Sequence, residues 1–323
     1  MKREGAEVIS VLEFYKTFDE GTIKLEKPET GCWINAIAPT EEERIYLEQE
    51  IGILPEFIKS SLDEEESSHI DYDDDMDQTL VIIDYPTLDR RMGNVHNSYY
   101  YTCPMGVILM KGYVVTVALY DSWSVTRIRE GRMRDVDTRL RVRFLLTLFL
   151  LISQRFLIGL RQIDYETSET EKALEKSLKN EGLLQLLSLE KSLVFFSTSL
   201  RSDQATLNRI HRGRHINLFE EDEELLEDVK IEINQCLEMC SIYSHIIAGM
   251  REAFSTVINN NMNDVMKYLA IITLVLSIPN IIFGFYGMNV PDLPVPWVWF
   301  PSVICIVTCI IALIWLIKGR LFR

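Results

Sequence analysis

Two long segments without a charged residue lie near the end of this chain and constrain its fold more than any other feature. The first covers 268–286 and the second covers 297–317. An α-helix rises about 1.5 Å per residue, so each segment is long enough to cross the roughly 30 Å hydrocarbon core of a bilayer. Trp297 and Trp299 open the second segment, as is typical of the aromatic belt at a membrane interface. The sequence therefore predicts a membrane protein with two C-terminal transmembrane helices.

The charges around these segments predict the orientation of the chain. Lys267 precedes the first segment, the tail 318–323 is basic, and the connecting loop 287–296 carries only Asp292 as a charged residue. Basic residues favour the cytoplasmic side. Both termini are therefore expected in the cytosol, at the cytoplasmic membrane, with the loop outside. No apolar stretch follows Met1 closely, which predicts that there is no cleavable signal peptide.

A further apolar run over 144–152 has the composition of a membrane span but is flanked by charge. Arg143 precedes it, and Arg155 and Arg161 follow within three helical turns. A charge held at membrane depth costs several kcal/mol. This run is therefore expected to form a helix buried inside the cytosolic part of the protein.

The remainder of the chain is strongly acidic. The sequence has 48 acidic and 33 basic residues and a net charge of −15, yet only one acidic residue lies after position 265. An acidic surface repels phosphate backbones and attracts cations. Nucleic acid is therefore excluded as a partner, and divalent cations are favoured.

The six cysteines are too few and too scattered for a disulfide framework. Cys236 and Cys240 lie one helical turn apart, as do Cys305 and Cys309. No further Cys or His stands near either pair to complete the four ligands of a metal site. We therefore expect these cysteines to be small packing residues of helices.

Residues 1–136 are predicted to form a cytosolic α/β domain. The segments 79–85 and 113–119 are rich in β-branched and aromatic residues, as strands require. Thr40 stands three residues before Glu43, a spacing that forms a capping box at the start of a helix. This mixture favours a mainly antiparallel or mixed sheet combined with helices.

Helical spacing dominates the rest of the chain. Residues 137–219 are predicted to form a helical hairpin, with breaks near 180–182 and 212–214. Residues 220–286 contain no proline before Pro279, so one helix of about 100 Å is expected to run from the cytosol into the bilayer. A rod of that length must pack against others like it, which favours a symmetric oligomer.

One face of the first membrane segment carries smaller and more polar side chains than its other faces. Its members recur at steps of three and four residues, with Leu269 beside them: Asn263, Met266, Ala270, Thr273, Ser277, Asn280 and Gly284. We refer to these eight residues as the polar stripe. Hydroxyl and amide groups inside a bilayer should face partners or water. Close helix packing by small residues is the alternative, but the Asn280 amide needs several hydrogen-bond partners. The stripe is therefore predicted to line a pore.

At the outer end of the same segment stands Tyr286-Gly287-Met288-Asn289. This motif, placed at the end of the first of two C-terminal spans with a short loop and a basic tail behind it, resembles the CorA family of magnesium channels. The segment 263–267 before the span is also similar to the family pattern. The resemblance implies a homopentamer around one central pore, Mg²⁺ as the transported ion, and a selectivity filter made of Gly287, Met288 and Asn289.

The chemistry of Mg²⁺ agrees with an uncharged stripe. Mg²⁺ prefers octahedral oxygen ligands and loses its water reluctantly, so a carboxylate cage would hold the ion too tightly to conduct it. Amide and hydroxyl oxygens can instead hydrogen-bond to an ion that stays hydrated. By the resemblance, five copies of Asn289 ring the outer mouth, where Asp292 adds attraction. Met266 and Leu269 are expected to form a narrow apolar gate near the cytosolic end of the membrane.

Acidic residues of the first domain are candidates for a regulatory metal site. The resemblance implies carboxylates on this domain that meet an Asp on a neighbouring long helix and bind Mg²⁺. Asp228 matches that Asp by its distance from the Gly-Met-Asn triplet, and its candidate partners are Asp73, Asp74 and Asp75. The alternating acids of this segment do not make an EF-hand, because Met76 stands where that loop requires Gly. A solvated acidic turn stays open as the alternative.

These observations predict a channel for Mg²⁺ uptake down its electrochemical gradient, gated by cytosolic Mg²⁺ bound between subunits. Transport of Co²⁺, Ni²⁺ or Zn²⁺ is the alternative within the same fold. A membrane-tethered enzyme or signalling protein is the alternative from another class. The sequence offers that class no nucleophile–base pair, phosphate-binding Gly-rich loop or zinc signature. We therefore expect no catalytic site.

Overall fold

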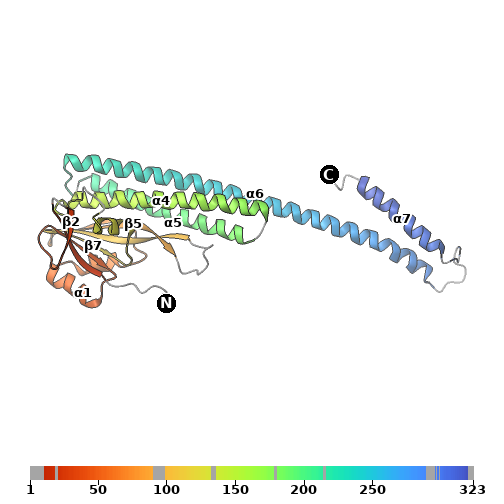
Figure 1. Cartoon of the computed structure of the whole chain (residues 1–323), viewed down its shortest axis with the longest axis horizontal. Coiled ribbons are helices and arrows are strands. Elements are labelled where there is room, and N and C mark those ends of the chain that lie inside the picture. The colour runs from red at the N-terminus through yellow and green to blue at the C-terminus, as the bar shows by residue number, and fades with distance from the viewer. Residues whose placement is uncertain are drawn as a thin grey trace. The chain divides into compact units, whose positions relative to one another are not determined.

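The chain folds into two compact units. The computed structural model describes residues 11–18, 21–89, 99–131, 136–177, 180–213, 216–288, 295, 297 and 299–318. The first unit covers Met1–Arg251 and the second covers Glu252–Arg323. Figure 1 labels several of the helices and strands.

A mixed sheet of seven strands forms the middle layer of the first unit. Its strands are β1 (Val11–Phe18), β2 (Gly21–Leu25), β3 (Cys32–Ile37), β4 (Ile70–Asp73), β5 (Gln78–Asp89), β6 (Tyr99–Met110) and β7 (Tyr113–Ala118). They lie in the order β2-β1-β3-β7-β6-β5-β4. The β3–β7 pair is parallel, and the other neighbouring pairs of this sheet are antiparallel. The two predicted strand segments lie in β5 and β7.

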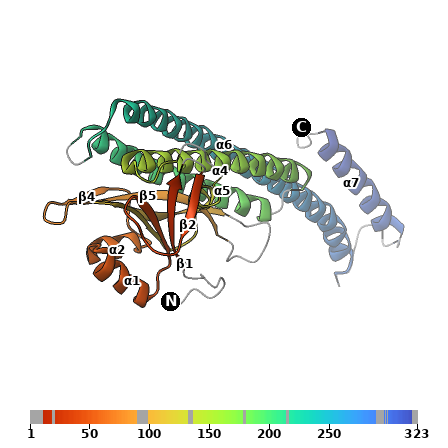
Figure 2. The same ribbon diagram turned by 60° about the vertical axis from the view of Figure 1, so that its left-hand side comes forward.

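Short helices cover one face of this sheet (Figure 2). They are α1 (Glu41–Tyr46), the π-helical turn η1 (Leu47–Ile51) and α2 (Pro55–Ser61). The predicted capping box begins α1, because the Glu43 amide donates to the Thr40 hydroxyl at 3.2 Å and the Thr40 amide donates to the Glu43 carboxylate at 2.7 Å. Leu47, Phe57 and Ile82 are buried in the core that joins these helices to the sheet.

Longer helices cover the opposite face of the sheet (Figure 2). After the short helix α3 (Trp123–Arg129), the chain forms α4 (Arg141–Lys176) and α5 (Asn180–His211). The Phe144 ring of α4 lies 5.3 Å from the Trp33 ring of β3. The Phe196 ring of α5 lies 4.9 Å from the Phe156 ring and 5.3 Å from the Tyr100 ring of β6. These aromatic contacts form the second core of the unit.

Three described helices, α4, α5 and α6 (Glu220–Tyr286), are long and apolar enough to cross a membrane by length and composition alone. In α4, 61% of the most apolar window is buried by protein, and Phe144, Leu145 and Phe149 are at most 1% exposed. In α6, the corresponding window is 0% buried. The apolar run 144–152 therefore packs as part of a core helix, as its flanking arginines predict.

The helix α6 has 67 residues and contributes to both units. Near its start, the Arg143 guanidinium of α4 forms an ion pair with the buried Asp222 carboxylate at 3.2 Å. Further along, the Cys236 thiol donates to the Ser153 carbonyl of α4 at 3.6 Å. Polar contacts therefore tie the first part of α6 to α4.

The boundary between the units differs from the predicted domain boundaries. The sequence separates 1–136, 137–219 and 220–286 by composition, whereas the first unit joins the sheet, α4, α5 and the part of α6 up to Arg251. The physical reason is that α4 and α5 supply the core on one face of the sheet. The helices of the predicted hairpin therefore form a layer of the first unit.

A close approach between β6 and α2 gives a test of this packing. A Cβ atom on Gly106 would lie 1.8 Å from the Ser61 Oγ and 2.6 Å from the Ser61 Cβ. Ser61 is 0% exposed and has no room to move away. We expect Gly106→Ala to destabilise the protein by about 1–3 kcal/mol through overpacking, measured as thermal unfolding of the full chain in detergent.

Two further variants serve as controls for this prediction. Gly249→Ala places its Cβ in open space on α6 and should be neutral or slightly stabilising. Adding Ser61→Gly to Gly106→Ala should recover part of the lost stability, because it removes the atoms that clash. Unchanged stability in Gly106→Ala alone would show that α2 does not sit this close to β6.

Candidate functional site

The polar stripe lies on the part of α6 that belongs to the second unit. Seven of its eight residues are exposed, and Ser277 is half-buried. At the expected gate, the Met266 and Leu269 side chains are 59% and 57% exposed. A single chain therefore leaves this face of α6 largely uncovered.

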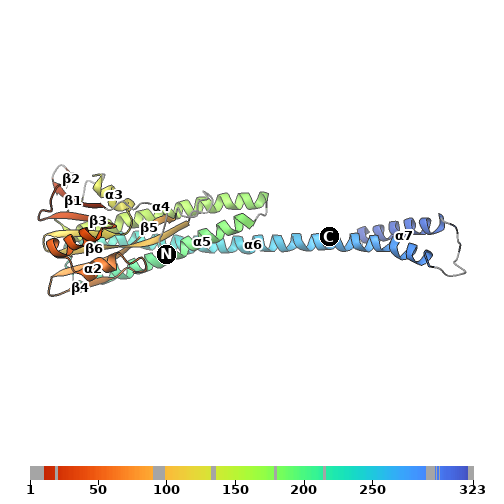
Figure 3. The same cartoon turned by 90° about the horizontal axis from the view of Figure 1, so that it is seen from below.

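The helix α7 (Trp299–Lys318) runs beside the end of α6 within the second unit (Figures 1 and 3). Half-buried apolar residues of α6 recur at helical spacing at Ile271, Val275, Ile278 and Ile282. On α7, Pro301 and Cys305 are buried. The Tyr286 ring of α6 lies 6.4 Å from the Phe300 ring of α7. Since each residue turns a helix by about 100°, the half-buried face of α6 lies opposite Thr273. We infer that α7 covers the face opposite the polar stripe.

Two hydroxyl groups of the stripe donate to the backbone of α6. The Thr273 hydroxyl donates to the Leu269 carbonyl at 2.8 Å, and the Ser277 hydroxyl donates to the Leu274 carbonyl at 2.7 Å. A hydroxyl that has used its proton in this way presents only acceptor lone pairs to the outside. Acceptors match the outward-pointing hydrogens of the water shell around a hydrated cation. The stripe therefore has the chemistry to contact a hydrated cation without binding it tightly.

The Gly-Met-Asn motif begins where α6 ends. The Gly287 amide donates to the Phe283 carbonyl at 2.9 Å, and the Met288 amide donates to the Phe285 carbonyl at 3.4 Å. The Met288 side chain is 51% exposed. The remaining filter residue, Asn289, and the loop residue Asp292 lie outside the described residues.

The predicted regulatory acids lie on different elements of the first unit. In the turn that follows β4, the Asp73 carboxylate accepts from the Met76 amide at 2.8 Å, while Asp74 and Asp75 are exposed. Asp228 is exposed on α6. Among the described residues, no group of three or more His, Cys, Asp or Glu side chains is placed to hold a metal ion. These four acids therefore do not form a metal site within one chain.

The paired cysteines of α6 are placed as packing residues. Cys236 and Cys240 are at most 1% exposed, and burial raises the pKa of each thiol to about 12. The thiolate, and not the neutral thiol, is the form that binds metals. This placement agrees with the prediction that this pair packs inside the protein.

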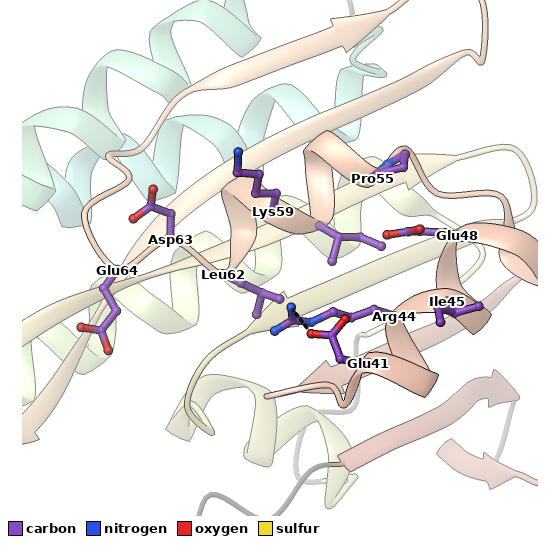
Figure 4. A pocket seen from close by; sticks show the side chains of 10 residues that line it. Glu41, Arg44, Ile45, Glu48, Pro55, Lys59, Leu62, Asp63 and Glu64 are labelled. Atoms are coloured by element: carbon purple, nitrogen blue, oxygen red, sulfur yellow. Dashed lines mark hydrogen bonds and ion pairs between the residues drawn. The ribbon is translucent and has the colours of Figure 1, made fainter. Parts of the chain in front are cut away.

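A surface pocket of about 500 Å³ between α1 and α2 is not foreseen from the sequence (Figure 4). Its charged lining residues are Glu41, Arg44, Glu48, Lys59, Asp63 and Glu64. The Arg44 guanidinium pairs with the Glu41 carboxylate at 3.0 Å. Along the chain these charges look like solvated helix faces, and only the approach of the two helices gathers them. None of the predicted site residues lines this pocket.

Known transport proteins are similar to this chain over most of its length. A family model described as CorA-like Mg²⁺ transporter protein matches residues 28–318. The cobalt/magnesium transport protein CorA of Methanocaldococcus jannaschii is 27% identical over 267 residues, which cover 81% of this chain and 81% of that protein. The protein of the same name from Thermotoga maritima is 22% identical over 313 residues, which cover 94% of this chain and 87% of that protein.

Solved structures share the fold. The complete structure of the CorA magnesium transporter from Methanocaldococcus jannaschii matches with a TM-score of 0.81 at 23% identity, covering 96% of this chain and 98% of that chain. The structure of the full-length CmaX protein matches with a TM-score of 0.70 at 17% identity, covering 99% of this chain and all of that chain (100%). Because the family model spans both units, from the sheet to the last helix, this chain belongs to the family of CorA-like Mg²⁺ transporter proteins.

Proposed function

We propose that this chain is one subunit of a homopentameric channel that carries Mg²⁺ into the cell down its electrochemical gradient. The observation that carries the proposal is the polar stripe, which is uncharged and stays uncovered on the face of α6 opposite α7. Membership of a family of Mg²⁺ transporter proteins supports the choice of ion. Family members are transporters and not enzymes, in agreement with the function predicted from the sequence.

Two membrane-spanning segments follow from the distribution of apolar surface. The segment 268–286 ends α6, whose most apolar window is 0% buried, and the segment 297–317 overlaps the apolar helix α7. Apolar surface of this extent needs lipid or protein around it. The basic residues beside both segments favour the cytosolic side for the first unit and for the C-terminus. The loop 287–296 then lies outside the cell.

Exposed apolar side chains of the first unit support assembly with further copies. They include Leu184, Leu187 and Val194 on α5 and Ile231 and Ile242 on α6, which are 48–58% exposed. Copies of the chain packed around one axis would cover such residues and would turn their polar stripes toward that axis. The number of five copies rests on the resemblance to the CorA family.

A hydrated ion suits a pore of this composition. The stripe hydroxyls present acceptors, and the Asn280 amide can accept from the same water shell. The inward membrane potential contributes about 2.3 kcal/mol per charge per 100 mV, and about twice as much for a divalent ion. Cobalt is the second candidate cargo, because the names of both relatives include it.

Regulation by Mg²⁺ between subunits completes the proposal. Asp228 and the acidic turn of Asp73, Asp74 and Asp75 do not form a site within one chain, so a metal bound by both needs two chains. Such a metal would relieve the repulsion between acidic neighbours and favour a closed arrangement of the helices. The ion shifts the closed population only by its greater affinity for that state.

The filter assignment predicts the effect of Asn289→Ala. We expect Mg²⁺ uptake into liposomes to fall by roughly tenfold or more, because the amide oxygens that receive the hydrated ion are removed. Asn260→Ala, which alters an exposed amide of α6 outside the stripe, is the matched control and should conduct like the parent. Size-exclusion chromatography checks that both variants assemble. Near-normal uptake by Asn289→Ala would remove this residue from the filter.

The apolar gate predicts the effect of a polar residue at Met266. Narrow apolar sections block ions by losing their water, so Met266→Ser should raise conduction at high internal Mg²⁺ by several-fold. Val265, on another face of α6, is 61% exposed, and Met266 is 59% exposed. Val265→Ser is therefore the matched control and should leave conduction unchanged. Tight closure of Met266→Ser under these conditions would place the barrier elsewhere.

The regulatory site predicts the behaviour of Asp228→Lys under protease. The parent should be protected by Mg²⁺ and cut in chelator, whereas Asp228→Lys should resist cutting in both, because a fixed cation replaces the bridging ion. Glu224→Lys, an exposed acid one turn earlier on α6, should behave like the parent. Equal cleavage of the parent with Mg²⁺ and with chelator would rule out sensing through this surface.

A further inference from the structure

The helix α5 packs on the sheet through a row of buried polar residues. Ser192, Ser199, Asp203 and Thr206 are at most 4% exposed and recur at steps of seven, four and three residues. The Ser192 hydroxyl accepts from the Tyr100 amide of β6 at 2.9 Å, and the Ser199 hydroxyl donates to the Thr102 hydroxyl of β6 at 2.8 Å. Polar side chains therefore form part of an interface that apolar residues usually fill.

The register of the sheet explains why polar groups are needed there. Pairing of β4 with β5 ends at Ile70 opposite Val81, and one more backbone bond follows, from the Ile82 amide to the His69 carbonyl at 2.9 Å. Beyond that point the Ser68 hydroxyl donates to the Ile82 carbonyl at 2.8 Å, and the Asp84 amide donates to the Asp203 carboxyl at 3.1 Å. Unpaired backbone groups in a protein interior are destabilising. Asp203 of α5 therefore supplies a hydrogen-bond acceptor to a backbone amide at the free edge of the sheet.

This arrangement brings the carboxyl of Asp203 to the backbone of a second buried acid, Asp84. Asp84 is 6% exposed and Asp203 is 1% exposed. Burial raises the pKa of Asp84 to about 6, against a smaller lowering by the hydrogen bond with Ser199. Burial, and then the charge of Asp84, raise the pKa of Asp203 well above its usual value. The pair therefore retains protons at a pH where ordinary carboxyl groups have lost them.

The side-chain groups bonded to the pair are hydroxyls. Ser199 bonds to Asp84 and Ser68 bonds to Asp203. The Ser199 and Ser68 hydroxyls also bond to the hydroxyls of Thr102 of β6 and Thr206 of α5, respectively. In the segment before β4, Glu66 and His69 lie 3.6 Å from one another and are part-exposed. In the described part of the chain, no Lys, Arg or His of the sheet, α4, α5 or α6 forms an ion pair with Asp84 or Asp203.

We propose that Asp84 and Asp203 form a proton-dependent latch, which holds α5 against the free edge of the sheet and loosens as the pH rises. With a proton on the pair, at most one negative charge has to be buried there. Without it, two negative charges repel one another, and neither forms an ion pair with a cation among the described residues.

The direction of the effect follows from the pKa values. Both carboxyls bind protons more tightly in the folded chain than at the ordinary value of 3.8. Their contribution to stability is therefore complete at low pH and is lost as the pH rises through that value. For Asp84 the loss ends near its folded pKa of about 6, and for Asp203 it continues to higher pH.

The latch is connected to the long helix of the first unit. The side-chain amide of Gln204, next to Asp203, donates from Nε2 to the side-chain Oδ1 of Asn234 of α6 at 2.5 Å. Near the other end of α5, Glu190 pairs with Arg251 of α6. A change in how α5 is seated therefore reaches α6 through these contacts. The latch depends on neither the identity of the transported ion nor the number of subunits.

Hydrogen exchange of the full chain in detergent tests this proposal. Protection of the α5 backbone amides over 199–207, corrected for the intrinsic pH dependence of exchange, should fall as the pH is raised from about 5 to about 8. The fall should approach about tenfold per pH unit for each proton released on opening. Asp203→Asn, which keeps the shape of the protonated carboxyl, should flatten this dependence and keep protection high at the upper pH.

Two more variants make the outcome decisive. Glu181→Gln removes an exposed carboxyl of the same helix and should retain the parent's pH dependence. Asp84→Asn should flatten the pH dependence of protection as Asp203→Asn does. It replaces Asp203→Asn in the test if Asp203→Asn folds poorly. Equal slopes for the parent and both Asn variants would overturn the proposal. Loss of α5 protection at low pH in both Asn variants would also overturn it, since an uncharged side chain of the same shape would then fail to hold the helix.

Discussion

A helix of 67 residues cannot bury its own surface, and much of this structure depends on what covers α6. Within the first unit, α6 is held by buried side chains, by the thiol of Cys236 and by the ion pair between Arg143 and Asp222. Within the second unit, its most apolar window is 0% buried. Burial of apolar surface is the main favourable term in folding and association. The uncovered part of α6 therefore needs other apolar groups around it, and the proposed function supplies them as lipid and further copies of the chain.

In the first unit, the two faces of the sheet must be covered by other residues, and the backbone groups at its free edge must be hydrogen-bonded. Apolar residues of α1, η1 and α2 pack on one face, and the aromatic residues of α4 and α5 pack on the other. At the edge beyond β4, backbone groups take their partners from Ser68 and Asp203. The polar row of α5 thus exists because a sheet edge inside a protein must be hydrogen-bonded. This hydrogen bonding at the edge places the buried acid Asp203 beside the buried acid Asp84.

The proposed transport chemistry follows from an uncharged pathway combined with an acidic surface. The stripe hydroxyls donate to the backbone of their own helix and leave acceptors outward. Under this proposal, carboxylates are kept out of the stripe and lie on the first unit, where a bound ion would regulate and would not be conducted. Such a division suits Mg²⁺, because this ion exchanges its water slowly and binds carboxylates well. It also agrees with the absence of acids from the polar stripe in a chain of net charge −15.

Local rules of the sequence were sufficient for the features that depend on neighbouring residues. The capping box at Thr40 and the arginines around 144–152 act over a few helical turns, so they could be interpreted without a structure. The triplet beginning at Gly287 indicated the resemblance to the CorA family. The tertiary structure alone decided the parallel pairing of β3 with β7, the close approach of Gly106 to Ser61, the face of α6 that α7 covers, and the meeting of Asp84 with Asp203. These contacts join residues far apart in the chain, and their geometry is set by how whole layers pack and not by any local pattern.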